Sequence, residues 1–257
     1  MDRCIFRLGL AVLCLAWAAP ISASPGAQTE PGTVDTIPSP SPEVAKMVEN
    51  IHWLGHDSFR LEGEGKVIYL DPYQLPAGAP PADLILITHD HSDHCSPADV
   101  ERIRTPETVV VTVAAAAAKL PKPVRLVSPG DSLVAQGIAV ETVPAYNTNK
   151  FRPPGKPFHP REVGNVGYVV TLDGRRIYHT GDTDLIPEMG TVRADVALLP
   201  VSGIYVMTVE EAVEAADLIR PKVAIPMHVG AGIGELDDAR RFEQTARVPV
   251  RVLPLER

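Results

Sequence analysis

The sequence predicts an α/β fold in which two β-sheets lie face to face with helices on their outer faces, an αββα sandwich. Two runs of short apolar segments, one before residue 144 and one after residue 165, have the length and β-branched content of strands. Helix-prone segments follow strands within each run. Because a sheet with an apolar face must bury it against another layer, two such runs favour two packed sheets. The 257 residues suffice for one substantial domain.

In the first run, Gly63 and Gly65 mark a hairpin turn between two strands. The stretch 84–87 is apolar throughout, so we expect a fully buried strand there. The expected strands of this run are 51–54, 58–62, 66–70, 84–87, 108–113, 124–127, 132–134 and 138–143, with helices at 96–104 and 114–119.

A Pro-rich segment, 144–164, separates the two runs, and a loop of this length inside a compact domain is usually functional. After it, Asp173-Gly174 predicts a second hairpin. Thr208 is expected to cap an amphipathic helix. The expected strands of the second run are 166–172, 175–179, 194–199, 223–226 and 250–253, with helices at 208–219 and 236–245.

The N-terminal residues 1–23 have the organisation of a cleaved signal peptide. Arg3 and Arg7 precede an apolar core and a stretch of small residues that ends at Ala23. Because the apolar core is too short to span a bilayer comfortably, we expect a periplasmic or secreted protein without a stable membrane anchor. Residues 24–43 are rich in Pro, Ser, Thr and Gly and predict a flexible linker, so the domain should occupy 44–257.

Charge and cysteine content narrow the function classes. Removal of residues 1–23 would leave Cys95 as the only cysteine, so the mature chain could form no internal disulfide. The net charge is −8 and basic clusters are absent, which argues against a nucleic-acid partner. A small-molecule substrate is the expected partner.

Metal-binding side chains are concentrated in Thr88-His89-Asp90-His91-Ser92-Asp93-His94, directly after the predicted buried strand. Neutral imidazoles and carboxylates are the ligands that zinc and similar divalent ions take. Because side chains alternate in an extended segment, His89 and His91 should point one way, while Asp93 and His94 turn to a second point. We therefore expect this loop to supply ligands to two adjacent ions.

This segment resembles the His-x-His-x-Asp-His signature of the metallo-β-lactamase-fold hydrolases, and the resemblance continues in order over about residues 50–230. The stretch 178–184, with Asp182, resembles the bridging-aspartate motif of the family, and 225–228 resembles its last histidine, His228. The stretches 53–59 and 70–72 resemble a branch that includes ascorbate-phosphate-lactonase-like and phospholipase-D-like members.

The resemblance implies an αββα sandwich of two mixed sheets that binds two divalent metal ions. The expected ions are Zn²⁺, with Mn²⁺ as an alternative, because the same ligand types accept both. Asp182 would bridge the ions, and Gly181 before it would allow the sharp turn that this position needs. The ligands carried over are His89, His91, Asp93, His94, Asp182 and His228.

The third histidine of the first ion is where this sequence departs from the family pattern. The family presents that histidine at the end of the strand corresponding to 138–143, and here the chain reads Val-Pro-Ala-Tyr-Asn over 143–147. Asn147 would be a weak zinc ligand, whereas His159 could fold back over the site from the Pro-rich loop. We expect His159 to be the ligand, with a supporting or substrate-contacting role as the alternative.

Other residues near the predicted site have two interpretations. His56 and Asp93 are the expected catalytic residues: His56 as a substrate-binding or ligand-supporting group, and Asp93 as a ligand that also orients a hydroxide. Asp71 either holds a ligand histidine or caps a turn, and His179 either supports the site or packs in the core. Cys95 is expected to be a small buried apolar residue.

The predicted function is an exported metal-dependent hydrolase that uses a metal-bridged hydroxide on an ester, lactone or phosphoester bond. Two adjacent divalent ions can lower the pKa of a shared water and polarise the substrate. Phosphodiesterase or phospholipase-type cleavage is the first alternative. The second is a metal-binding family member with little catalysis, which the missing histidine at position 147 would favour.

Overall fold

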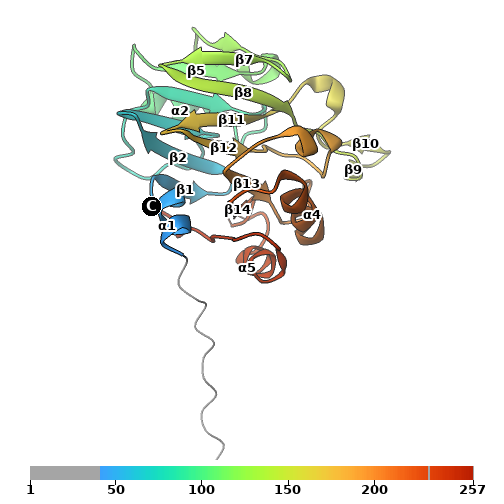
Figure 1. Cartoon of the computed structure of the whole chain (residues 1–257). Helices are drawn as coiled ribbons and strands as arrows, with labels where there is room; N and C mark the ends of the chain where they lie inside the picture. Colours follow the sequence, from blue (N-terminus) through green and yellow to red (C-terminus); the bar gives the residue numbers. More distant parts are fainter. Residues whose placement is uncertain (1–40, 231, 257) are drawn as a thin grey trace, which may run out of the picture. The chain divides into compact units, whose positions relative to one another are not determined.

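The computed structural model describes residues 41–230 and 232–256, which form two six-stranded β-sheets (Figure 1). The predicted signal peptide and residues 24–40 of the predicted linker lie outside the described residues. Helix α1 (Pro42–Val48) is capped by the Ser41 side chain, which accepts a hydrogen bond from the Val44 amide. In the described part of the chain, we find no helix with the length and apolar character that crossing a membrane requires.

The first sheet has the strand order β1-β2-β3-β4-β5-β6. Its first three strands form an antiparallel meander, and β3, β4, β5 and β6 then run parallel. Helix α2 (Pro97–Ile103) connects β4 with β5, and the short α3 (Ala114–Ala117) follows β5. The strands are β1 (Ile51–Gly55), β2 (Ser58–Gly63), β3 (Lys66–Leu70), β4 (Leu84–Ile87), β5 (Val109–Thr112) and β6 (Arg125–Leu126).

The second sheet has the strand order β14-β13-β12-β11-β8-β7. The strands from β7 to β12 pair antiparallel, and β12, β13 and β14 are parallel, so both sheets are mixed as expected. The strands are β7 (Ser132–Ala135), β8 (Ile138–Pro144), β11 (Val166–Leu172), β12 (Arg175–His179), β13 (Val196–Pro200) and β14 (Val223–Met227).

The core lies between the sheets, and helices cover the second sheet from outside. All residues of β4, β13 and β14 are buried, as parallel strands covered on both faces require. Helices α4 (Val209–Ile219) and α5 (Leu236–Thr245) contact each other and pack against β13 and β14 respectively (Figure 1). Thr208 caps α4 in a capping box with Glu211, which confirms the predicted start of this helix.

The Pro-rich loop is more structured than predicted. It contains the small hairpin of β9 (Phe151–Arg152) and β10 (Lys156–Pro157), followed by the 3₁₀ turn η1 (Arg161–Val163). A second 3₁₀ turn, η2 (Pro187–Thr191), lies between β12 and β13. The loop between β8 and β11 therefore carries His159 on a defined path.

The predicted last strand, 250–253, is wrong. Val250 forms a single isolated bridge with Ala224, and the chain makes no ladder with β14 there. Pro249 and Pro254 flank this stretch, and a proline has no amide hydrogen to donate to a ladder. The β-branched residues between them therefore form only one bridge.

Tyr168 joins the two sheets through a buried polar contact. Its hydroxyl, on β11 of the second sheet, donates to the carbonyl oxygen of Ile87 at the end of β4, at 3.0 Å. The side chain is fully buried, so its hydroxyl has no water to replace that acceptor. This contact fixes the strand that precedes the His89–His94 loop against the opposite sheet.

Tyr168→Phe should lower the free energy of unfolding by about 1–2 kcal/mol, since it removes one buried hydrogen bond and leaves its acceptor less well satisfied. Urea unfolding measures the change. Tyr73→Phe is the matched control, because the Tyr73 hydroxyl makes only an exposed contact with Gln74. Equal stability of the two variants would contradict the role given to Tyr168.

Candidate metal centre

Polar side chains from several strand ends meet at one end of the sandwich. His56 and Asp57 form the two-residue turn between β1 and β2, which is closed by the Gly55–Ser58 pair. The segment from His89 to His94 follows β4, Asp182 follows β12, and His228 follows β14. Because these ends come from both sheets, the sandwich brings together residues that are far apart in the sequence.

The first group of possible metal ligands consists of His89, His91, His159 and Asp182, whose ligand atoms all lie within 4.8 Å of one another. His159 Nε2 is 3.2 Å from His91 Nδ1 and 3.3 Å from Asp182 Oδ2. His89 Nε2 is 3.9 Å from the same Asp182 oxygen. Ligand atoms at about 2.0–2.1 Å from a tetrahedral ion are about 3.3 Å apart, so this spacing fits one divalent cation.

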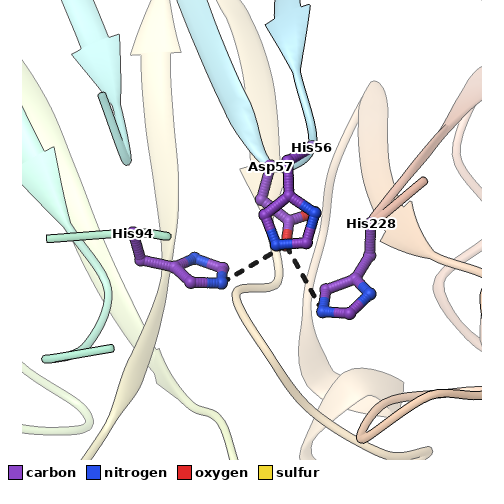
Figure 2. Close-up of side chains that lie close together, drawn as sticks. All are labelled: His56, Asp57, His94 and His228. Carbon is purple, nitrogen blue, oxygen red and sulfur yellow. Dashed lines mark ion pairs between the residues drawn. The ribbon is translucent and has the colours of Figure 1, made fainter. Parts of the chain in front are cut away.

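The second group consists of His56, Asp57, His94 and His228, again with ligand atoms within 4.8 Å of one another. Figure 2 shows these four side chains pointing toward one another from three separate segments. Asp57 Oδ2 lies 3.6 Å from His56 Nε2, 3.5 Å from His94 Nε2 and 4.0 Å from His228 Nε2. These distances also fit one cation.

Asp182 lies between the two groups. Its Oδ1 is 3.3 Å from His94 Nε2, and its Oδ2 is 3.5 Å from His228 Nε2 as well as 3.3 Å from His159 Nε2. Burial raises the pKa of Asp182, but the imidazoles of His94 and His228 outweigh it and hold that pKa well below its usual range. An ionised carboxylate that faces both groups can contact an ion in each.

The histidines are oriented by hydrogen bonds to the ring nitrogen that points away from the site. Asp71 Oδ2 lies 2.8 Å from His94 Nδ1, and Asn147 Oδ1 lies 3.0 Å from His159 Nδ1. Ser202 and Thr88 make the corresponding contacts with Nδ1 of His228, at 2.8 Å, and of His89, at 2.9 Å. Acceptors at Nδ1 place the ring proton there and leave Nε2 with a free lone pair.

These contacts bear on two alternatives that the sequence leaves open, the role of Asp71 and the choice between His159 and Asn147. Asp71 holds His94, and it is itself fixed by hydrogen bonds from the amide and the hydroxyl of Thr88, at 2.7 and 2.6 Å. The structure places His159 in the first group, and Asn147 supports it by accepting from the His159 amide at 2.7 Å. Asn147 therefore lies behind the group of possible ligands.

The donor atoms at the centre are buried and unsatisfied. Within the described residues, His56 Nε2, His89 Nε2 and His94 Nε2 have no hydrogen-bond partner, and neither do Asp182 Oδ1 and both carboxylate oxygens of Asp57. Burying a polar atom without a partner costs about 1–3 kcal/mol, and a charged one more. So many lone pairs converging on two points fit divalent cations, which satisfy them all.

Several site residues have a strained backbone. His56, Asp71 and His228 have φ values of 52°, 43° and 60°, in the left-handed region that disfavours residues with a Cβ atom. Gly181, before Asp182, has φ +64°, and a Cβ there would lie 2.9 Å from the Val166 carbonyl oxygen. The surrounding fold imposes these conformations, and they aim the side chains at the centre.

The remaining predicted residues take different places. His56 is 1% exposed and lies in the second group of possible ligands. Asp93 belongs to neither group, and its Oδ2 is 3.2 Å from His56 Nε2, so its role as a ligand stays a prediction.

His179 supports the site, because its Nε2 contacts the Asp57 carbonyl oxygen at 2.9 Å and its Nδ1 accepts from the Gly181 amide at 3.1 Å. Cys95 is buried, as expected, and burial raises the pKa of its thiol to about 11.

Asp57 is the site residue that sequence reasoning missed. The sequence Gly-His-Asp-Ser at 55–58 is typical of a polar turn, and that interpretation hides the carboxylate. The available signal was the shortness of the turn, since a two-residue turn that brings His56 to the centre brings Asp57 there too.

A cavity of about 240 Å³ opens beside the first group. Burial lowers the pKa of His89 well below its ordinary value, and the neighbouring His94 acts in the same direction, so His89 is a neutral imidazole able to bind a cation. The second group contributes nothing to the cavity wall. The lining residues are His91, Ser92, Asp93, Phe158, His159, Asp182 and Tyr205.

Known proteins share both the sequence pattern and the fold. Residues 50–228 match the family model described as the Beta-lactamase superfamily domain. The chain is 35% identical over 198 residues to a UPF0173 metal-dependent hydrolase of Archaeoglobus fulgidus, covering 69% of this chain and 82% of the relative. It is 36% identical over 202 residues to a UPF0173 metal-dependent hydrolase of Methanoculleus marisnigri, covering 75% and 86%. A crystal structure from Parabacteroides distasonis, described as a metal-dependent hydrolase, has a TM-score of 0.71 at 33% identity, covering 80% of this chain and 93% of that one.

Asp71→Asn should weaken zinc binding about 10–100-fold, because it removes the charged partner that orients His94. Competition with a chromophoric chelator measures the affinity. Asp83→Asn is the matched control, since Asp83 also binds a backbone amide, that of Val67, at 2.9 Å, but lies away from the centre. Equal zinc affinity in Asp71→Asn and the wild type would show that Asp71 merely supports the turn.

Proposed function

Because the chain belongs to the metallo-β-lactamase superfamily of metal-dependent hydrolases, we propose that it holds two divalent ions and cleaves an ester, lactone or phosphoester bond of a small molecule. The observation that carries this proposal is the pair of donor groups that share Asp182. One carboxylate facing two sets of unsatisfied imidazoles is the arrangement that a two-ion hydrolytic centre needs.

The residues of the first group would hold one ion through His89, His91 and His159, and those of the second would hold the other, with Asp182 between them. Bound ions of this kind lower the pKa of water toward neutrality and polarise the oxygen of the bond to be cleaved. The serine that contacts a histidine of the centre, Ser202, lies at Nδ1 of His228, the ring nitrogen that faces away from the donor groups, so it is not placed to attack a substrate there. Water is therefore the nucleophile that the proposal requires.

Asp93 is positioned to orient that water. It lines the cavity, and His56 lies 3.2 Å behind its carboxylate. Burial raises the pKa of Asp93, but the contact with His56 and the charge of His94 hold it below the ordinary range. An ionised Asp93 can accept a hydrogen bond from the attacking water and set its direction, which is the catalytic part assigned to this residue.

The mouth of the cavity favours a substrate with an apolar or aromatic group beside the bond that is cleaved. The rings of Phe158 and Tyr205 lie 4.3 Å apart at the cavity wall, and the Tyr205 side chain is partly exposed. The cavity of about 240 Å³ has room for a small group beside the first group of possible ligands. These features support an ester or lactone of modest size.

Zn²⁺ is the ion proposed for both positions, with Mn²⁺ as the alternative. Imidazole nitrogen and carboxylate oxygen suit either ion. The proposal of a metal-binding protein with little catalysis relied on the missing histidine at position 147. The place of His159 among the possible ligands supports the catalytic proposal over this alternative.

Export to the periplasm or the medium remains part of the proposal, on the strength of residues 1–23. Expression of the full chain in a Gram-negative host should yield a periplasmic protein whose N-terminus lies near Ser24. Subcellular fractionation and N-terminal sequencing measure this. An uncleaved cytoplasmic product would contradict it.

The paired substitution His89→Ala/His91→Ala should lower hydrolysis at least about 100-fold, because it removes two ligands of the ion beside the cavity. A panel of p-nitrophenyl esters, simple lactones and bis-p-nitrophenyl phosphate measures the rate, with and without chelator. His52→Ala is the matched control, because His52, on β1, pairs with Glu256 and lies away from the centre. Chelator-insensitive turnover that survives in the paired variant would contradict the proposed function.

A further inference from the structure

Asp57 is a buried carboxylate whose charge the fold does not satisfy with hydrogen bonds. Its side chain is fully buried, and within the described residues neither of its oxygens accepts a hydrogen bond. In the same part of the chain, its ion-pair contacts are with histidines alone.

Asp184 shows how this fold stabilises a buried aspartate that serves structure. It is as buried as Asp57, but its oxygens accept from the amides of Thr148 and Asn149, at 2.6 and 2.8 Å, and from the side chain of Asn147, at 3.0 Å. Asp57 has no comparable donors. A buried carboxylate surrounded by imidazoles, and not by N–H donors, is suited to a cation.

The position of Asp57 agrees with that role. Its Oδ2 lies between the Nε2 atoms of His56, His94 and His228, at 3.6, 3.5 and 4.0 Å (Figure 2). Nδ1 of His94 and of His228 is occupied by Asp71 and Ser202, so their Nε2 atoms face the same point as Asp57. The four side chains surround one position.

We propose that Asp57 is a further ligand of the second metal ion, beyond the residues that the sequence pattern assigns to it. The sequence pattern assigns Asp93 to this ion, and Asp93 Oδ2, 3.2 Å from His56 Nε2, approaches the group from the cavity side, whereas Asp57 approaches it from the buried side. A structural zinc site has its full set of protein ligands, and a catalytic site keeps a position open. The inference rests on the proposed two-ion function.

The exposure of the two groups supports this division. His56, Asp57, His94 and His228 are each 0–1% exposed, and none of them lines the cavity. In the first group, His91 is partly exposed, and it lines the cavity with His159. A substrate in the cavity would therefore meet the first group, and Asp57 would hold the second ion from the buried side.

Calorimetric titration of the metal-free protein with Zn²⁺ tests this assignment. The wild type should bind two ions. Asp57→Asn should bind one ion with an affinity within about twofold of the wild type and the other at least about tenfold more weakly. Asp90→Asn is the matched control, because Asp90 lies in the same histidine-rich segment but pairs with Lys119, and it should bind both ions as the wild type does.

The melting temperature of the metal-free variants separates loss of a ligand from loss of the fold. Metal-free Asp57→Asn should melt at the wild-type temperature or above it, since the substitution removes a buried charge without hydrogen bonds. Two ions bound at wild-type affinity by Asp57→Asn would overturn the proposal, as would a metal-free variant that melts several degrees lower. A wild type that binds fewer than two ions would contradict the two-ion function itself.

Discussion

The carboxylate of Asp182 is the point on which the rest of the centre depends. The imidazoles of His94, His159 and His228 approach it to 3.3–3.5 Å from three separate segments. His94 and His228 follow the ends of strands β4 and β14, and His159 lies in the long loop between β8 and β11. The strand register therefore determines the site, because a shift of one residue in a strand would turn the side chains at its end away from Asp182.

Hydrogen bonds around Asp182 orient the histidine rings of the centre. Asp71, Asn147 and Ser202 occupy the outer nitrogens of three histidines. The left-handed backbone at His56 and His228 serves the same end, because relaxed backbone would point these side chains elsewhere. The result is a centre whose inner atoms are buried, oriented and without partners, ready for cations.

Much of this could be predicted from sequence, because strand ends position ligands in a regular way. The buried run at 84–87 predicted the strand that precedes His89 and His94, and the resemblance to the family pointed to Asp182 after the strand 175–179. His159 was harder, since a loop hairpin and Asn147 decide its position and neither has a periodic pattern. Asp57 was missed because a two-residue turn resembles exposed polar sequence until both strands are seen to end inside the sandwich. The strand predicted at 250–253 failed because propensity does not account for flanking prolines.

Anomalous diffraction from crystals grown with zinc tests the central claim most directly. We expect two anomalous peaks, about 3.5–4 Å apart, one among His89, His91 and His159 and one among His56, Asp57, His94 and His228, with Asp182 contacting both. A single peak, or two peaks that do not share Asp182, would contradict it.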